Sequence, residues 1–261
     1  MKNFIKKIGT IILAAGLNIP KLIYSIIGLF AFIKDAFIYL CSLIYMRDSI
    51  HFKFSLYPIL GDRYGTAGIA SGHYFHQDLW ASRKIHELAP LIHVDVGSRI
   101  DGFISHLLTF RDVIVIDVRK LESKVKGLTF LQHDMMSELP VHLLGFDSVS
   151  SLHAIEHFGL GRYGDPVDPN GWSKGFINLS KMLKNGGYLY FSVPVGEQRV
   201  EFNAHRIFSP NTIIDLALTV GLSLIEFSLI DDEGNFHENI TPDSAESCHY
   251  ACGCFLFIKI G

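Results

Sequence analysis

The segment His153-Ala154-Ile155-Glu156-His157 holds side chains that can bind a metal ion or move a proton. On a helix, the histidines at positions i and i+4 would face one side, an arrangement that can hold a catalytic Zn²⁺. That site needs a long helix and a third protein ligand, but three glycines follow within seven residues. The preferred interpretation is acid–base chemistry: His157 is the general base, Glu156 orients it, and His153 or His76 is the alternate base. A second alternative is that Glu156 and His157 only brace the loop.

Three aspartates come at the ends of three consecutive apolar runs, and they indicate a ligand site. Asp95, Asp117 and Asp134 end the runs 91–97, 111–119 and 128–134. Gly97 stands at the first turn, where a glycine lets the backbone approach a ligand closely as the next helix begins. Asp117 follows about twenty residues later, the spacing at which a carboxylate accepts both hydroxyls of a ribose. The pattern predicts a nucleoside cofactor.

The elements that must position these residues are short β-branched runs that alternate with helical or loop segments. Five runs, at 91–97, 111–119, 128–134, 146–154 and 186–196, are typical of buried parallel strands. Ser209 and Pro210 open a helix that Gly221 closes, and two further runs, 222–232 and 249–260, read as an antiparallel pair. We therefore predict an α/β fold with a doubly wound, Rossmann-like sheet of seven strands that ends in an antiparallel pair.

The first 47 residues differ in composition from the rest of the chain. They hold six basic residues against one acid, which leaves +5, whereas the whole chain of 261 residues carries −3. Only Lys21, Lys34 and Asp35 interrupt the apolar sequence between Ile8 and Met46. Residues 1–47 are predicted to form apolar helices that precede a catalytic domain at 48–261.

Three roles are open for this segment. A basic, apolar helix whose lysines snorkel suits an interfacial anchor or shallow hairpin on an anionic cytoplasmic leaflet. A pair of helices capping the domain and a signal peptide are the alternatives. The four cysteines, three of them between Cys248 and Cys254, are too few for a secreted framework. We read Cys252 and Cys254 as buried small hydrophobes and expect no metal. The protein is predicted to be cytoplasmic and peripheral at the inner face of a membrane.

The element order resembles that of class I S-adenosylmethionine-dependent methyltransferases. The resemblance implies that Asp134 faces the adenine amino group while Met135 packs near the ring, and Gly186-Gly187 resembles the family's turn before the fifth strand. Arg99 departs from the usual glycine-rich loop. The cofactor residues so implied are Asp95, Gly97, Ser98, Arg99, Gly102, Asp117, Asp134 and Met135.

A tighter resemblance lies in the blocks 61–80, 93–103, 152–169 and 199–210. They are similar to a family of largely uncharacterised bacterial and nematode proteins, a domain of unknown function related to methyltransferases, over roughly residues 55–240. Arg99 and Asp101 belong to that family's block, so their departure from the ordinary loop need not mean an inactive site.

The predicted function is methyl transfer from S-adenosylmethionine to a small or lipid-linked polar acceptor, which a saccharide would satisfy. The loop 159–172 is expected to contact the acceptor, since loops rich in functional groups at this sheet edge usually carry function. The predicted substrate residues are His73, His76, Arg162, Asp165 and His205. The alternatives are a non-catalytic methyltransferase-like binding module and the zinc hydrolase described above. The net negative charge gives no reason to expect a nucleic-acid partner.

Overall fold

The computed structural model describes residues 16, 18–45 and 53–260. The chain forms two compact units, Met1–Ile69 and Ala70–Gly261. Lys2, Lys6, Lys7 and Arg47, and the boundary predicted after residue 47, lie outside the described residues.

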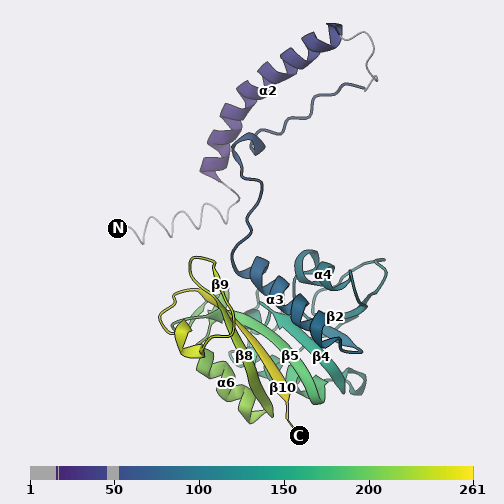
Figure 1. Cartoon of the computed structure of the whole chain (residues 1–261), viewed down its shortest axis with the longest axis vertical. Helices are drawn as coiled ribbons and strands as arrows, with labels where there is room; N and C mark the ends of the chain where they lie inside the picture. Colours follow the sequence, from purple (N-terminus) through teal and green to yellow (C-terminus); the bar gives the residue numbers. More distant parts are fainter. Residues whose placement is uncertain (1–15, 17, 46–52, 261) are drawn as a thin grey trace. The chain divides into compact units, whose positions relative to one another are not determined.

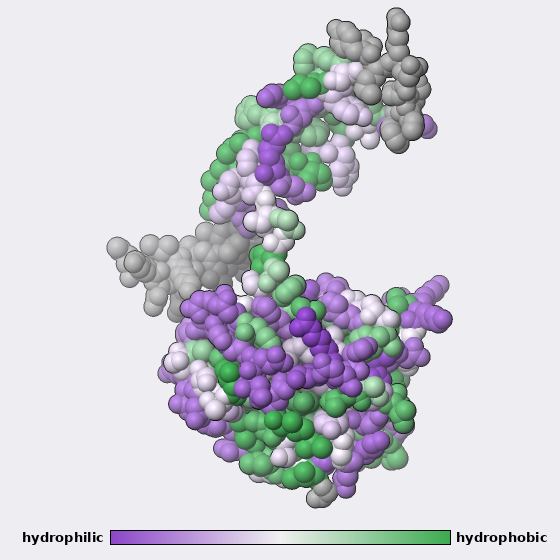
Figure 2. Space-filling model, in the orientation of Figure 1, coloured by the Kyte–Doolittle hydropathy of each residue, from purple (hydrophilic) through white to green (hydrophobic). Residues whose placement is uncertain are grey.

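The first unit contains one long apolar helix, α2 (Ile19–Tyr45, Figure 1). Its stretch Ile19–Leu43 is long and apolar enough to cross a membrane by length and composition, since 25 helical residues rise about 38 Å against a hydrocarbon core of about 30 Å. Most of its large apolar side chains are exposed, as the green and white surface of Figure 2 shows. Asp35 pairs with Arg63, in the 3₁₀ turn η1 (Asp62–Tyr64) of the same unit.

The second unit is built on an eight-stranded sheet with the order β3-β2-β1-β4-β5-β10-β8-β9. Its strands are β1 (His93–Val96), β2 (Val113–Asp117), β3 (Leu128–Gln132), β4 (Phe146–Leu152), β5 (Leu183–Val195), β8 (Leu222–Ile230), β9 (Phe236–His237) and β10 (Ala251–Lys259). Strands β1 to β5 are parallel, and β10 lies antiparallel to both of its neighbours, β5 and β8. The predicted doubly wound sheet with a terminal antiparallel pair is confirmed, and the two-residue β9 adds an eighth strand. A separate hairpin pairs β6 (Arg199–Glu201) with β7 (His205–Ile207).

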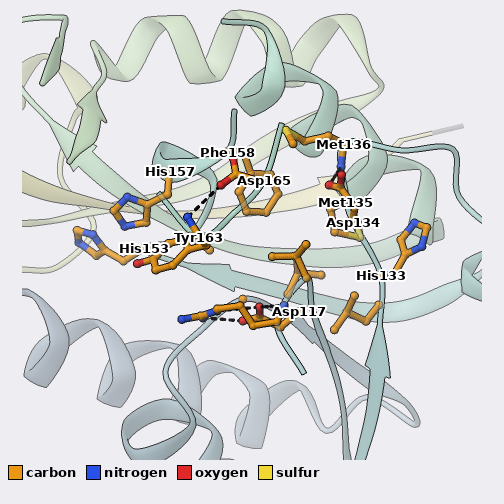
Figure 3. Close-up of a pocket in the computed structure, with 16 residues that line it drawn as sticks. Asp117, His133, Asp134, Met135, Met136, His153, His157, Phe158, Tyr163 and Asp165 are labelled. Atoms are coloured by element: carbon orange, nitrogen blue, oxygen red, sulfur yellow. Dashed lines mark hydrogen bonds and ion pairs between the residues drawn. The ribbon is translucent and has the colours of Figure 1, made fainter. Parts of the chain in front are cut away.

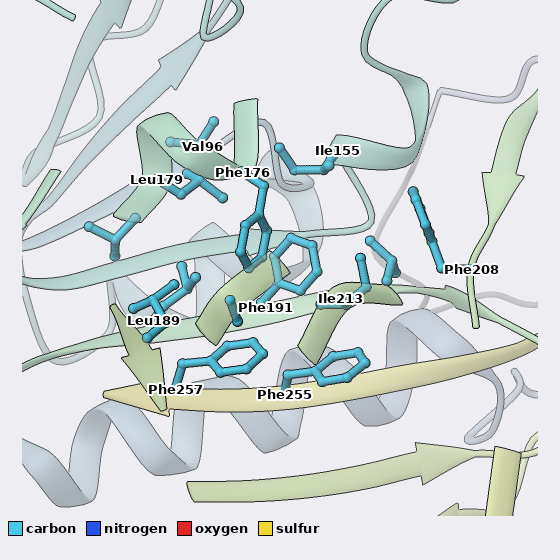
Figure 4. Packing of buried hydrophobic residues seen from close by; sticks show 14 of the residues in the cluster. Val96, Ile155, Phe176, Leu179, Leu189, Phe191, Phe208, Ile213, Phe255 and Phe257 are labelled. Atoms are coloured by element: carbon cyan, nitrogen blue, oxygen red, sulfur yellow. The ribbon is translucent and has the colours of Figure 1, made fainter. Parts of the chain in front are cut away.

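Helices cover both faces of the sheet and enclose two apolar clusters. The main ones are α3 (His73–Leu88), the π-helical turn η2 (Ile100–Ile104), α4 (Ser105–Leu107), α5 (Gly171–Met182) and α6 (Pro210–Thr219). Trp80 of α3 and Phe103 of η2 belong to one cluster, and Phe176 of α5 and Ile213 of α6 belong to the other. Figure 4 shows the second cluster, in which Phe176 packs on the sheet.

Alternation along the strands decides which side chains reach each face. Along β10, Phe255 and Phe257 enter the α5/α6 cluster, whereas Cys252 and Cys254 enter the α3 cluster. The prediction that these two cysteines are buried on one face is confirmed. Ser209 and Pro210 open α6 as predicted, but the Ser209 side chain forms no cap hydrogen bond.

A buried histidine at the start of β1 makes the stability of the fold depend on pH. His93 is fully buried between the hydroxyls of Ser148 and Ser150, at 2.6 and 3.0 Å from its ring nitrogens. Burial, aided by the charge of Arg111, lowers the pKa of His93 from 6.5 to about 3. The neutral ring is thus favoured on folding, so its contribution is complete above pH 6.5 and declines as the pH falls toward 3.

We therefore expect the free energy of unfolding of the wild type to fall by about 2 kcal/mol more than that of His93→Asn between pH 7 and pH 5. Urea unfolding of both proteins at the two pH values measures this difference. Equal losses in the two proteins would show that His93 titrates alike in the folded and unfolded states.

Candidate functional site

Two adjoining cavities lie at the carboxyl ends of the parallel strands, where doubly wound folds bind ligands. The first is lined by the ends of β1, β2 and β3 (Figure 3). The second is larger and more polar. The cavities share a wall made by Gly97, Asp117, Arg119, His153, His157 and Tyr163.

Gly97 follows β1 and forms the turn that borders both cavities. Its φ of +73° is in the left-handed region that glycine adopts freely. A Cβ built there would lie 2.9 Å from the Ala154 Cβ. A side chain at position 97 would therefore both strain the turn and collide with Ala154, which lines the first cavity.

Asp117 ends β2, and its carboxylate is held by Arg119 two residues later. Arg119 donates from Nε to Oδ1 at 3.0 Å and from a terminal nitrogen to Oδ2 at 2.7 Å, and its backbone N–H also bonds Oδ1 at 2.8 Å. The guanidinium lies 4.4 Å from the centre of the Tyr163 ring. The Asp117 side chain is 16% exposed and that of Arg119 53% exposed. The arginine is therefore the more exposed partner of a carboxylate that lines the cavity.

Asp134 and Met135 follow β3 and line the first cavity. The Asp134 carboxylate accepts the Met136 N–H at 2.8 Å. The Met135 side chain is buried, and its carbonyl accepts a hydrogen bond from Asn178 of α5 at 2.8 Å. These bonds fix the turn, so that an acid and a thioether face the same end of the cavity.

His153 and Glu156 form a buried pair at the shared wall. His153, with a φ of +50°, follows β4, and Glu156 lies in the 3₁₀ turn η4 (Ile155–His157). The ring Nδ1 is 2.8 Å from Glu156 Oε1. Burial opposes both charges, but the proximity of the partners lowers the pKa of Glu156 and raises that of His153. His153 Nε2 and Glu156 Oε2 are buried and have no hydrogen-bond partner among the described residues.

His157 lines both cavities and has a defined tautomer. Its Nδ1 lies 2.7 Å from the Ala204 carbonyl, so Nδ1 carries the proton and Nε2 is left with its lone pair. Burial lowers the pKa of His157, which Glu156 partly offsets. Arg162 donates to the same carbonyl at 2.8 Å. The sequence predicts Glu156 as the group that orients His157; in the structure Glu156 pairs with His153, and the Ala204 carbonyl orients His157.

The loop that covers the site is braced from within. Asp165 accepts the backbone N–H groups of Gly159, Gly161 and Tyr163 at 2.8, 3.3 and 3.1 Å. The buried Arg206 donates to the Phe158 carbonyl at 2.6 Å. The Asp165 carboxylate, predicted to contact substrate, is thus engaged by the backbone of its own loop.

The structure brings most of the predicted site residues together. Those that line the two cavities are Gly97, Ser98, Arg99, Asp117, Asp134, Met135, His153, Glu156, His157, Arg162, Asp165 and His205. Tyr163, in the loop 159–172 that is expected to contact the acceptor, lines both cavities. Residues that the sequence did not single out, Tyr74, Tyr250 and Arg119, complete the walls.

Four predicted residues stand back from the cavity walls. Asp95 is fully buried and accepts hydrogen bonds from Ser98 and Ser150. Gly102 lies in η2. His73 stacks on His153, with 5.2 Å between ring centres, and His76 stacks on Phe236 of β9 at 5.7 Å.

The geometry of η4 also bears on the zinc-hydrolase alternative. Ile155–His157 is a three-residue 3₁₀ turn, and His153 precedes it with a left-handed backbone. The long helix that would place His153 and His157 on one face is therefore not formed. Their Nδ1 atoms bond different groups, Glu156 and the Ala204 carbonyl.

Comparison with known proteins agrees with this architecture. Residues 105–237 match the family described as "Caenorhabditis protein of unknown function, DUF268". No curated protein matches the sequence.

Solved structures to which the chain is similar are distant from it in sequence. A protein assigned as a sarcosine dimethylglycine methyltransferase, from Galdieria sulphuraria, is 14% identical, with a TM-score of 0.51 over 70% of this chain and 84% of that one. The YcgJ protein of Bacillus subtilis is 13% identical, with a TM-score of 0.50 over 71% and 99%. A Burkholderia thailandensis 1,6-didemethyltoxoflavin-N1-methyltransferase with bound S-adenosylhomocysteine is 13% identical, with a TM-score of 0.48 over 71% and 79%.

Proposed function

The chain belongs to the family described as "Caenorhabditis protein of unknown function, DUF268", and we propose that it transfers a methyl group from S-adenosylmethionine to a polar acceptor. The observation that carries the proposal is the shared wall of the two cavities. The first cavity, at the ends of β1 to β3, suits a nucleoside. It adjoins the polar second cavity at His157, whose Nε2 is free to accept a proton.

The residues of the first cavity fit the cofactor. The backbone of Gly97, in a turn that glycine adopts freely, borders both cavities. Asp117 would accept the ribose hydroxyls, and Asp134 and Met135 would meet the adenine end. S-adenosylmethionine, when bound, supplies an activated methyl group. Because this group needs no further activation, the protein must chiefly align the acceptor and exclude water.

The second cavity suits a polar acceptor. Arg99, Arg162, His205 and three tyrosines line it, and such side chains bind hydroxyl and anionic groups or stack on sugar rings. An acceptor hydroxyl must lose its proton as it attacks. His157 Nε2 would take that proton, since Nδ1 is already committed to the Ala204 carbonyl. Glu156 Oε1, 3.7 Å from Nε2, would stabilise the imidazolium so formed.

One observation favours the second candidate function, a binding module without turnover. Arg119 occupies both carboxylate oxygens of Asp117, the group expected to hold the ribose. A cofactor must therefore displace the arginine, or share the carboxylate with it.

Transfer of a labelled methyl group separates the two candidates. The full chain is incubated with methyl-labelled S-adenosylmethionine and polar lipid or saccharide fractions from cells. We expect label in one polar fraction, with an equal amount of S-adenosylhomocysteine formed. A protein that binds S-adenosylhomocysteine but labels no fraction would be the binding module.

We also propose that α2 attaches the protein to a membrane and so brings the site to a lipid-linked acceptor. Support comes from the apolar stretch Ile19–Leu43 and from the exposure of its side chains. Burial of apolar side chains in lipid and attraction of the basic N-terminus to anionic headgroups would act together.

The full chain is thus expected to sediment with vesicles that contain phosphatidylglycerol, and a fragment of residues 70–261 to stay in solution. High salt should weaken binding without abolishing it, since apolar burial is not screened. Equal sedimentation of chain and fragment, or none by either, would contradict the attachment.

A further inference from the structure

Three potential metal ligands from distant parts of the sequence meet beside the shared wall. His73 begins α3, His153 follows β4, and Cys252 lies in β10. One ring nitrogen of each histidine and the Cys252 Sγ all lie within 4.8 Å of one another. We propose that these three side chains bind a Zn²⁺ ion, with one coordination position left for water or an oxygen of a substrate.

The donor chemistry favours zinc. Imidazole nitrogens and a thiolate are the ligands that Zn²⁺ prefers, and three protein ligands with one open position are typical of catalytic zinc sites. In a tetrahedral site the donor atoms are about 3.3–3.6 Å apart, given Zn–N and Zn–S bonds of about 2.0–2.3 Å. Because no two of the three donors are more than 4.8 Å apart, they need to close by at most about 1.5 Å.

A second, independent observation is the state of His153. Its Nδ1 is engaged by the buried Glu156 carboxylate at 2.8 Å, the usual outer partner of a zinc-binding histidine. Its Nε2 is buried and has no hydrogen-bond partner among the described residues, although the side chain is only 3% exposed. A buried imidazole with one nitrogen held by a carboxylate and the other unpartnered is prepared for a metal.

His73 offers a neutral ring, because burial, together with His153, lowers its pKa to about 4. Burial raises the pKa of the Cys252 thiol, and the contact with Glu156 raises that of His153, so both groups carry a proton. Binding of Zn²⁺ would form the zinc–sulfur bond and the bond to His153 Nε2, and would release both protons to solvent. His153 lines both cavities, so the open position of the ion would border the polar one.

The test uses the full chain, purified in detergent without chelators. We expect about one zinc per chain. After removal of zinc, Co²⁺ should restore one ion with thiolate-to-cobalt charge-transfer absorption. Cys252→Ser should lose that absorption, and His73→Asn should weaken Co²⁺ binding at least tenfold. Cys254→Ser is the matched control. The Cys254 Sγ lies 4.0 Å from the Cys252 Sγ on the same strand face, but Cys254 is not one of the three proposed ligands.

Failure to bind Co²⁺ in the wild type, or unchanged absorption in Cys252→Ser, would overturn the proposal. If Cys252→Ser fails to fold, Co²⁺ binding by His73→Asn still tests the proposal, since His73 is only half-buried. Unchanged Co²⁺ affinity in that variant would then overturn it. The inference does not rest on methyl transfer. Binding of S-adenosylhomocysteine by metal-free protein would leave the cofactor proposal standing whichever result cobalt gives.

Discussion

Replacing His157 with asparagine is expected to lower methyl transfer to a hydroxyl acceptor by ~10²–10⁴-fold, the usual loss when a general base is removed. Asparagine can place an amide nitrogen near the position of Nδ1 and so keep the bond to the Ala204 carbonyl, while nothing replaces Nε2. The melting temperature and the affinity for S-adenosylhomocysteine should therefore remain close to those of the wild type. Turnover, calorimetry and thermal unfolding measure the three quantities.

Two further variants sharpen this test. His157→Gln places its amide near Nε2 instead, and should lose turnover as fully as asparagine. His142→Asn, an exposed histidine in the 3₁₀ turn Val141–Leu143, is the control and should leave all three quantities unchanged. If His157→Asn lost stability and cofactor affinity as well as turnover, His157 would be a residue that braces the loop.

Replacing Asp117 with alanine should weaken S-adenosylhomocysteine binding by at least ~10²-fold, with little loss of stability. The carboxylate is expected to accept two ribose hydroxyls, and hydrogen bonds to a charged group contribute ~1.5–3 kcal/mol each. Arg119→Ala should not weaken binding, because the arginine competes with the ribose for the same oxygens. Calorimetric titration measures each dissociation constant.

Asp215→Ala, at an exposed position on α6, is the matched loss of charge and should bind like the wild type. Unchanged affinity in Asp117→Ala would mean that the ligand is not held by a carboxylate at the end of β2. Equal losses in Asp117→Ala and Arg119→Ala would show that the ion pair supports the loop instead of yielding to the ribose.

Much of the fold follows from local sequence pattern. The β-branched runs that end at Asp117 and near Asp134 form strands, as predicted. β2 is largely buried, because a strand covered on both faces must be apolar along its length. β3 lies at the edge of the sheet and is intermediate or exposed along its length, so the prediction of a buried strand was wrong there. The same rule does not reveal where a strand-end side chain points. Asp95 lies within β1, between Val94 and Val96, which face the α5/α6 cluster, so its side chain turns to the other face and is buried there.

The parts of the site that the sequence did not reveal come from backbone groups and from distant segments. The Ala204 carbonyl that orients His157 has no signature in side-chain type. The meeting of His73, His153 and Cys252 depends on the insertion of β10 between β5 and β8, which brings residues far apart in sequence onto one face. Arg119 and Asp117 are only two residues apart, so their pairing could have been predicted from the local sequence.

Titration of the full chain with S-adenosylhomocysteine in a calorimeter tests the central claim most directly. We expect saturable binding of one molecule per chain, competed by S-adenosylmethionine and weakened in Asp117→Ala. Absence of saturable binding of both compounds by folded protein would contradict the account, because the cavity at the ends of β1 to β3 would then serve a different ligand.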